Sequence, residues 1–275
     1  MIQIEDLKFR YGRRSTLFDG LNLTLDSGHI YGLLGRNGAG KTTLLKIMTG
    51  MLFPEKGACR VMNYESKRRK PSMLCDIMFV PEEFYAPPVT IRRYADLYAP
   101  YYPQFDATQF AACLDEMQLD RSDRLHSLSL GQKKKAVLAF ALAANTRTLI
   151  LDEPTNGLDI PSKTQFRRMV ASAAADERCI IISTHQVRDV DKLIDAIIIL
   201  DNSRIVLNQS IGGIAAKLTF DVASELTGKE VYHEESISGY QVIRPDGGQS
   251  TPVNLELLFN AVMANKPAFE QMFHA

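Results

Sequence analysis

The chain has 275 residues, 45% of them hydrophobic and 23% charged, and its 32 Lys and Arg balance its 32 Asp and Glu. This length allows one large α/β domain with a small addition. The zero net charge argues against a general nucleic-acid-binding protein, which needs a basic surface, and no apolar stretch approaches the ~20 residues of a membrane-spanning helix.

Residues 1–5 lack the basic and apolar regions of a secretory signal, so we expect none. The cysteines are scattered and form no C-x-x-C pair, which predicts reduced, buried side chains instead of disulfides or a zinc site. They are Cys59, Cys75, Cys113 and Cys179. Together these features predict a cytosolic protein.

Short apolar segments predict an N-terminal group of strands. Residues 21–25 alternate strictly between apolar and polar, which is typical of a half-buried strand, and residues 2–9 alternate imperfectly. Residues 30–34 are an apolar run of the buried type, and a further short strand is expected near residues 58–62.

Residues 35–42 read G-x-x-x-x-G-K-T, the pattern of a phosphate-binding loop between a buried strand and a helix. Residues 43–48 have helical spacing and supply that helix. The glycines let the backbone N–H groups turn toward an anion, and the helix dipole adds positive charge there. We expect Lys41 to reach the β- and γ-phosphates and the Thr42 hydroxyl to bind Mg²⁺.

The middle of the chain predicts a buried strand at residues 77–80 and then a small helical insert over residues 90–119, where Pro100 and Pro103 separate two helices. A helix over residues 133–144 follows. Its first turn would carry three consecutive lysines. Because the helix dipole disfavours cations at that end, this placement suggests that an anion binds there.

Later strands alternate with helices, which is the pattern of a parallel sheet covered on both faces. The strands are expected at residues 148–151, 179–182, 197–200 and 204–207, and the helices at 161–174 and 187–193. After residue 218 the sequence pattern changes. It predicts hairpin strands at 230–233 and 239–244, a turn at 245–248 and a helix at 255–264.

Three polar side chains follow two of the buried strands. Asp152 can hold Mg²⁺, and Glu153 can orient or deprotonate a water. His185 can bond the γ-phosphate, although an isolated histidine at a strand end is usually structural. Tyr11 can stack on a purine, although a tyrosine is more often a packing residue.

These motifs, in their order along residues 1–215, resemble the ATP-binding cassette (ABC) ATPase family. The resemblance implies an α/β fold of the P-loop NTPase type: residues 1–217 with a parallel core sheet, an antiparallel β subdomain and a helical insert at about 84–145, then an α+β appendage at 218–275. It assigns ATP contacts to Tyr11, Gly35, Arg36, Asn37, Gly38, Ala39, Gly40, Lys41, Thr42, Thr43, Ser129, Gly131, Gln132 and Asp159. It assigns catalysis to Lys41, Glu153 and His185, and Mg²⁺ binding to Thr42, Glu82 and Asp152.

Two positions depart from the family pattern. Residues 128–132 read L-S-L-G-Q, so Leu130 replaces the first glycine of the L-S-G-G-Q signature, and Glu82 replaces the usual glutamine of the Q-loop. A carboxylate still binds Mg²⁺ but donates no amide hydrogen bond. These changes concern turnover more than function.

The resemblance implies that the signature faces a nucleotide held by a second cassette, in a homodimer or heterodimer with two ATP molecules between the chains. It also implies a separate integral-membrane permease, a position on the inner face of the cell membrane, and an export-type transporter. Two alternatives remain: an ABC ATPase of iron–sulfur assembly or translation, and a regulatory ATP-binding module with little turnover. GTP is disfavoured because no N-K-x-D motif is present.

Overall fold

The computed structural model describes residues 1–12, 15–237, 239–245 and 251–273. At its centre is a six-stranded sheet in which five strands are parallel and the edge strand β10 is antiparallel to β9. Across the sheet the strands are β10 (Arg204–Ser210), β9 (Ala196–Asp201), β3 (His29–Leu34), β8 (Cys179–Thr184), β7 (Thr148–Asp152) and β6 (Ile77–Val80). The predicted parallel sheet is confirmed. Its five parallel strands have buried apolar centres because both faces of the sheet are covered, whereas the edge strand β10 carries polar residues at both ends.

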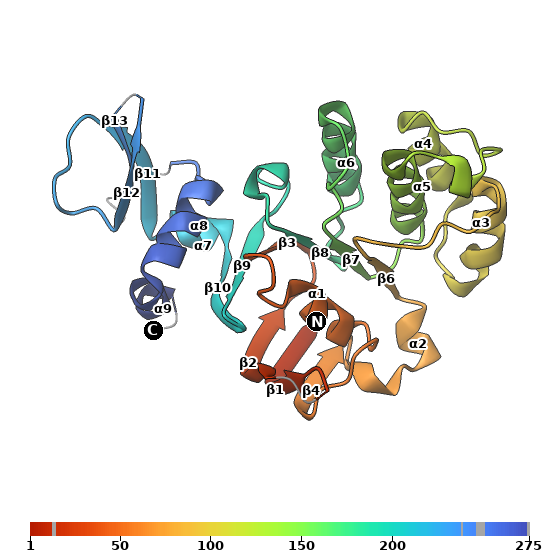
Figure 1. Ribbon diagram of the computed structural model, residues 1–275, viewed down its shortest axis with the longest axis horizontal. Helices are drawn as coiled ribbons and strands as arrows, with labels where there is room; N and C mark the ends of the chain where they lie inside the picture. The colour runs from red at the N-terminus through yellow and green to blue at the C-terminus, as the bar shows by residue number, and fades with distance from the viewer. Residues whose placement is uncertain (13–14, 238, 246–250, 274–275) are drawn as a thin grey trace.

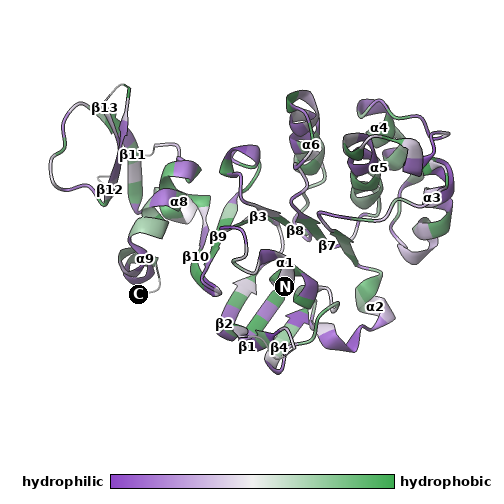
Figure 2. Cartoon of the chain, in the orientation of Figure 1, coloured by the Kyte–Doolittle hydropathy of each residue, from purple (hydrophilic) through white to green (hydrophobic). Residues whose placement is uncertain are grey.

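An antiparallel sheet packs below it, with strand order β2-β1-β4-β5 (Figure 1). Its strands are β1 (Ile2–Arg10), β2 (Thr16–Leu25), β4 (Lys56–Val61) and β5 (Tyr64–Glu65). Figure 2 shows bands of alternating hydropathy along β1, β2 and β4, as expected for strands with one buried face. The alternation of β1 is imperfect because its register shifts between Ile4 and Leu7, where Asp6 has φ 46°.

Helix α1 (Lys41–Met48) lies between the two sheets, because its buried residues share one apolar cluster with β1, β2 and one face of the central sheet. The other face of the central sheet packs on helices in a second cluster. The remaining helices of this part are α2 (Pro71–Leu74), α3 (Ile91–Tyr98), α4 (Ala107–Glu116), α5 (Leu130–Ala143), α6 (Ile160–Ser172) and α7 (Ile211–Ala215). Strand β3 therefore delivers the phosphate-binding loop between two packed layers.

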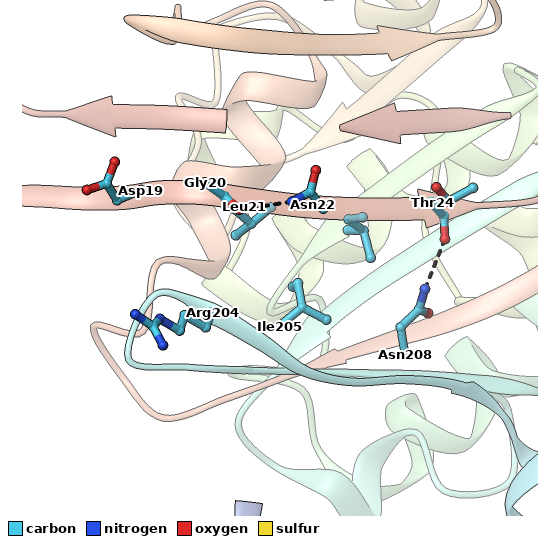
Figure 3. Close-up of a pocket in the computed structure, with 9 residues that line it drawn as sticks. Asp19, Gly20, Leu21, Asn22, Thr24, Arg204, Ile205 and Asn208 are labelled. Atoms are coloured by element: carbon cyan, nitrogen blue, oxygen red, sulfur yellow. Dashed lines mark hydrogen bonds between the residues drawn. The ribbon is translucent and has the colours of Figure 1, made fainter. Parts of the chain in front are cut away.

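The edge strands β2 and β10 join the two sheets on one side. Figure 3 shows the pocket that they line, of about 570 Å³, in which the Asn208 side chain donates to the carbonyl oxygen of Thr24 at 3.0 Å. No residue of the phosphate-binding loop lines this pocket. This pocket is therefore separate from the phosphate-binding loop.

The C-terminal part has its own three-stranded antiparallel sheet, ordered β11-β13-β12, and two helices (Figure 1). Its elements are β11 (Leu218–Ala223), β12 (Tyr232–Ser236), β13 (Gly239–Pro245), α8 (Leu255–Ala264) and α9 (Lys266–Phe273). Strand β11 and helix α9 were not expected from the sequence, and the expected turn at residues 245–248 lies largely outside the described residues. Apolar side chains of this part, Phe269 among them, belong to the same buried cluster as α5 and α6.

Two expected helices differ in the structure. Helix α5 begins at Leu130, three residues earlier than predicted, because Ser129 caps it. The segment predicted as a helix at residues 187–193 is a 3-10 turn, Val187–Asp189, followed by further turns. These turns end at Asp195, which is fixed to β3: its N–H donates to the carbonyl oxygen of Ile30 and its carboxylate accepts from the Ile30 N–H.

Within the described residues, no helix has both the length and the apolar character needed to cross a bilayer.

Candidate nucleotide-binding site

The glycine-rich loop connects β3 to α1, as the sequence predicts. Gly38 and Gly40 have φ values of 80° and 107°, in the left-handed region that favours glycine. Gly35 is required for space, because a Cβ there would lie 2.4 Å from the carbonyl oxygen of Leu200. The loop thus turns tightly into the N-terminus of α1, which begins at Lys41.

Lys41 is buried and faces the acidic end of β7. Its ammonium donates to the carbonyl oxygen of Gly35 at 2.8 Å and lies 3.7 Å from a carboxylate oxygen of Glu153. Within the loop, the Ala39 N–H donates to the carbonyl oxygen of Arg36 at 3.2 Å. A single cation therefore lies between the loop and the carboxylates, where it can meet a phosphate.

The predicted metal ligands Thr42 and Asp152 touch each other. The Thr42 hydroxyl donates to one oxygen of Asp152 at 2.7 Å, and the Ser183 hydroxyl donates to the other. Ser183 was not predicted. The signal was its place at the end of β8, paired in register with Asp152. Asp152 is only 1% exposed, so these two hydroxyls orient a carboxylate that is removed from water.

Glu153 follows β7 in the left-handed conformation, with φ 46°. Its N–H donates to the Ser183 hydroxyl at 3.1 Å, and one carboxylate oxygen is 2.9 Å from Nδ1 of His185. The second oxygen, Oε2, is buried and has no hydrogen-bond partner among the residues that the structure describes. An unpartnered buried carboxylate oxygen is costly unless something else binds it, so this atom is available to a water or another ligand.

Seven residues line one pocket of about 300 Å³ at this end of the sheet. They are Asn37, Gly38, Lys41, Thr42, Glu82, Glu153 and His185. Glu82 enters it from the loop after β6 and accepts a hydrogen bond from the Asn156 side chain at 2.9 Å. The structure therefore brings together the loop, the cation, the carboxylates and the histidine that the sequence predicts.

Tyr11 lies beside this loop and is 43% exposed. Its hydroxyl is 2.9 Å from that of Thr43, and its ring meets the ring of Phe9 edge-on, with centroids 4.9 Å apart. The packing and stacking interpretations are compatible here, because the ring is held by Phe9 yet keeps an accessible surface.

Other predicted ATP contacts do not line the pocket. Ser129 and Gln132 form a capping box at the start of α5: the Ser129 hydroxyl accepts from the Gln132 N–H at 3.3 Å, and the Gln132 side chain accepts from the Ser129 N–H at 3.1 Å. Asp159 caps α6 by accepting from the Ser162 N–H, and hydrogen bonding by the Ser162 side chain, together with that N–H, lowers the pKa of its carboxyl. Gly131 approaches Gly157, whose carbonyl oxygen would lie 3.1 Å from a Cβ at residue 131.

The lysines of α5 do not occupy its first turn, so our inference of an anion attracted by them is wrong for Lys134. Its side chain is 2% exposed and donates to the carbonyl oxygens of Glu153 and Asn156 at 2.9 and 2.8 Å. Burial lowers the pKa of Lys134. Sequence reasoning missed this contact because it joins helix and loop across 19 residues of chain.

A glycine-rich loop at a helix N-terminus, with a buried lysine and two strand-end carboxylates around one pocket, defines a P-loop nucleoside triphosphatase. The model for the family described as "ABC transporter" matches residues 18–156. The chain belongs to this family, and it is an ATP-hydrolysing subunit of an ABC transporter.

Similar proteins extend beyond the matched residues. "ABC transporter ATP-binding protein YtrB" of Bacillus subtilis is 27% identical over 97% of this chain and 99% of its own. "Lantibiotic transport ATP-binding protein SrtF" of Streptococcus pyogenes is 30% identical over 78% and 92%, and "Cobalt import ATP-binding protein CbiO" of Salmonella typhi is 32% identical over 78% and 83%. The solved "Structure of ATP binding subunit of ABC transporter" has a TM-score of 0.69 at 24% identity, over 78% of this chain and 91% of that one. That last similarity confirms the predicted fold.

Proposed function

We propose that this chain binds ATP with Mg²⁺ in the pocket between the phosphate-binding loop and β7. The carrying observation is that Lys41, Thr42, Asp152, Glu153 and His185 meet there, although they come from three separate strand ends. Lys41 and the loop N–H groups bind the phosphates. The exposed part of the Tyr11 ring receives the adenine.

The residues present fit Mg²⁺. Thr42 and Asp152 offer hydroxyl and carboxylate oxygens already in contact, and Glu82 adds a carboxylate on the opposite wall. Hard oxygen ligands of this kind suit Mg²⁺, which needs only one or two protein ligands when phosphates supply others. When bound, the ion neutralises charge that develops on the phosphates.

Glu153 orients and deprotonates the attacking water. Its free oxygen Oε2 is the acceptor for that water, and His185 fixes the other oxygen at 2.9 Å. Lys41 stabilises the negative charge of the transferred phosphoryl group. His185 then serves both to hold Glu153 and to contact the γ-phosphate.

The signature corner, Ser129 to Gln132, works on the nucleotide of a second cassette. Its polar groups are exposed and lie outside the pocket of their own chain, and Leu130 beside them is 66% exposed. A helix N-terminus with a serine cap is a ready site for a phosphate. Two cassettes, identical or related, thus enclose two nucleotides, with Asp159 near the interface, and hydrolysis separates them.

We also propose that residues 1–217 are the ATPase domain, with the helical insert at about 84–145, and that residues 218–275 are an appendage. The insert offers a docking surface to a separate integral-membrane permease, which would hold the chain on the inner face of the membrane. The name "Nod factor export ATP-binding protein I" of a Paraburkholderia xenovorans relative supports an export role, and the name CbiO supports an import role. The export relative matches 98% of this chain and 89% of its own length, against 78% and 83% for CbiO, which leads us to favour export.

The test is Glu153→Gln, compared with Glu83→Gln, which alters the acidic residue next to Glu82 outside the pocket lining. The Glu153 variant keeps ATP affinity, hydrolyses ATP only at a slow residual rate and accumulates as an ATP-bound dimer in size-exclusion chromatography. A Glu153→Gln protein that hydrolyses ATP at the wild-type rate would overturn the catalytic assignment. If the Glu153→Gln variant stays monomeric with ATP, even when the permease is present, the two-cassette assignment is overturned.

A further inference from the structure

The signature helix and the catalytic carboxylate of the same chain are joined by one buried side chain. Lys134 lies on the second turn of α5, whose first turn carries Ser129 and Gln132 as its cap. Its ammonium reaches out of the helix to the loop after β7 and donates to two carbonyl oxygens, those of Glu153 and Asn156. At 2% exposure the ammonium has little alternative contact with water.

The peptide that Lys134 holds is an unusual one. Glu153 is a non-glycine residue with φ 46°, a conformation that its neighbours must maintain. Its N–H is fixed by Ser183 at 3.1 Å and its carbonyl oxygen by Lys134 at 2.9 Å. The two bonds clamp the residue from both sides, and so direct its side chain toward Lys41 and His185.

Lys134 is also connected to Glu82, through Asn156. Asn156, whose carbonyl oxygen accepts from Lys134 at 2.8 Å, donates its side-chain N–H to Glu82 at 2.9 Å. Lys134 is thus the centre of a chain of contacts that runs from Glu82 through Asn156 to Glu153. It also places a positive charge among the three carboxylates of the pocket region, Glu82, Asp152 and Glu153.

We propose that Lys134 is a positioning residue for hydrolysis: it holds the Glu153 peptide in the conformation that aims the carboxylate into the pocket, and it ties that peptide to the signature helix. A movement of α5 on engaging the second cassette would then be transmitted to Glu153 of the same chain. The inference rests on the catalytic role proposed above for Glu153.

The test is Lys134→Met, which keeps the length and packing of the side chain and removes all three N–H donors. Because a misplacement of about 1 Å costs a catalytic group up to ~10²-fold in rate, we expect kcat to fall by about tenfold to 10²-fold. The KM for ATP and the Kd for a fluorescent ATP analogue should stay near the wild-type values. Lys133→Met is the matched control, because the Lys133 ammonium makes no side-chain hydrogen bond among the described residues.

A double-mutant cycle separates positioning from general structure. In the Glu153→Gln background no catalytic carboxylate remains to be aimed, so adding Lys134→Met should slow single-turnover hydrolysis no further. An equal loss in both backgrounds, or no loss in either, would overturn the proposal. Non-additivity with Ser129→Ala, found beside full additivity with Glu153→Gln, would also overturn it, because the lysine would then act through the signature alone.

Two further variants test the proposal if Lys134→Met folds poorly or if its loss has another cause. If Lys134→Met yields little folded protein, Lys134→Gln, which keeps two N–H donors, goes through the same cycle. Asn156→Ala removes the contact with Glu82 but keeps the carbonyl oxygen that Lys134 binds, so it should cost less than Lys134→Met; a larger loss would contradict our assignment. If Glu153→Gln alone leaves hydrolysis unchanged, the catalytic role of Glu153 fails, whereas a normal Lys134→Met beside an inactive Glu153→Gln refutes only this inference.

Discussion

We propose that the pocket at the end of β7 and the signature corner at the start of α5 both bind phosphate, but the two differ in how far one chain buries and fixes their side chains. In the pocket, Lys41, Asp152 and Glu153 are 7%, 1% and 5% exposed, and each is fixed by bonds within the chain. At the corner, Ser129 and Leu130 are exposed, and the capping bonds concern only their own helix turn.

This difference identifies which part of the site a single chain completes. A buried, hydrogen-bonded carboxylate is preorganised before the nucleotide arrives, so little reorganisation is needed during reaction. An exposed helix cap can bind an anion, and at this corner we propose that the second cassette supplies that anion with its nucleotide. We therefore expect changes in the pocket to affect each chain by itself, and changes at the corner to affect the other chain's nucleotide.

The largest effect should come from Lys41→Met. It removes the only side-chain cation that lines the pocket among the described residues, and so both phosphate binding and charge stabilisation. We expect hydrolysis to fall by about 10²–10³-fold, the loss typical for a preorganised donor to developing charge. Phosphate release is the measurement, with Lys46→Met on the same helix as control. Near-normal activity of Lys41→Met would show that the pocket is not the site of hydrolysis.

Ser129→Ala should weaken the corner without affecting the pocket. The loss of a hydroxyl donor to a phosphate predicts a decrease in hydrolysis of about tenfold to a hundredfold, while ATP binding to a single chain is unchanged. The lost cap also costs roughly 1 kcal/mol of stability, which Ser129→Gly largely avoids. Ser127→Ala is the control. A higher Kd of the monomeric chain for ATP would show that the corner contacts the nucleotide bound in the pocket of the same chain.

Mixing the Lys41→Met and Ser129→Ala chains tests whether the pocket of one chain works with the signature corner of another. A dimer of one Lys41→Met chain and one Ser129→Ala chain has one doubly damaged site and one intact site. If the protein forms homodimers, an equimolar mixture should recover about a quarter of the wild-type rate, because half the dimers are mixed and each has one of two sites. Phosphate release from the mixture and from each parent is the measurement. No recovery would contradict a site shared between two copies of this chain.

Leu130→Gly should have a smaller effect of the opposite sign. The leucine side chain projects from the corner, 66% exposed, at the position where the family has glycine. Its removal allows closer approach of a second chain, so we expect the ATP-dependent dimer of the Glu153→Gln protein to tighten, by no more than about tenfold, ~1.4 kcal/mol. Analytical ultracentrifugation gives the dimer Kd, with Leu130→Ala as an intermediate. An unchanged or weaker dimer would show that the leucine contacts the partner favourably.

The smallest effect should be the response of the C-terminal part to low pH. This part includes neither the pocket nor the signature corner. The Thr227 N–H, with help from the Thr227 hydroxyl and Arg244, lowers the pKa of Glu230 from its ordinary 4.5 to about 2. A lowered folded-state pKa contributes stability above pH 4.5 that is lost as the pH falls toward 2. The amide protection factors of β11–β13, which correct for the slower intrinsic exchange in acid, should therefore fall over that range, and less so in Glu230→Gln. An equal fall in both proteins would exclude Glu230 as the cause.

Local signals allowed much of the fold and pocket to be predicted. The phosphate-binding loop is legible because Gly35 and Lys41 have fixed spacing in the chain, and Asp152 and Glu153 because they end a continuous apolar run. Where the prediction was wrong or incomplete, a long-range contact decided: Asp195, fixed to Ile30, ends the turns after β8, and α9 packs through Phe269 into a core formed by distant elements.

The sequence by itself determined the class of the protein, its nucleotide chemistry and the order of its motifs, because each motif is a short run whose function depends on its own spacing. The tertiary structure alone decided that Ser183 orients Asp152, that Lys134 holds the Glu153 peptide, and that the signature corner does not line the pocket of its own chain. The first two are contacts between residues far apart in the chain. Only the packing of the sheet and its helices brings such residues together, since no local pattern encodes their distance.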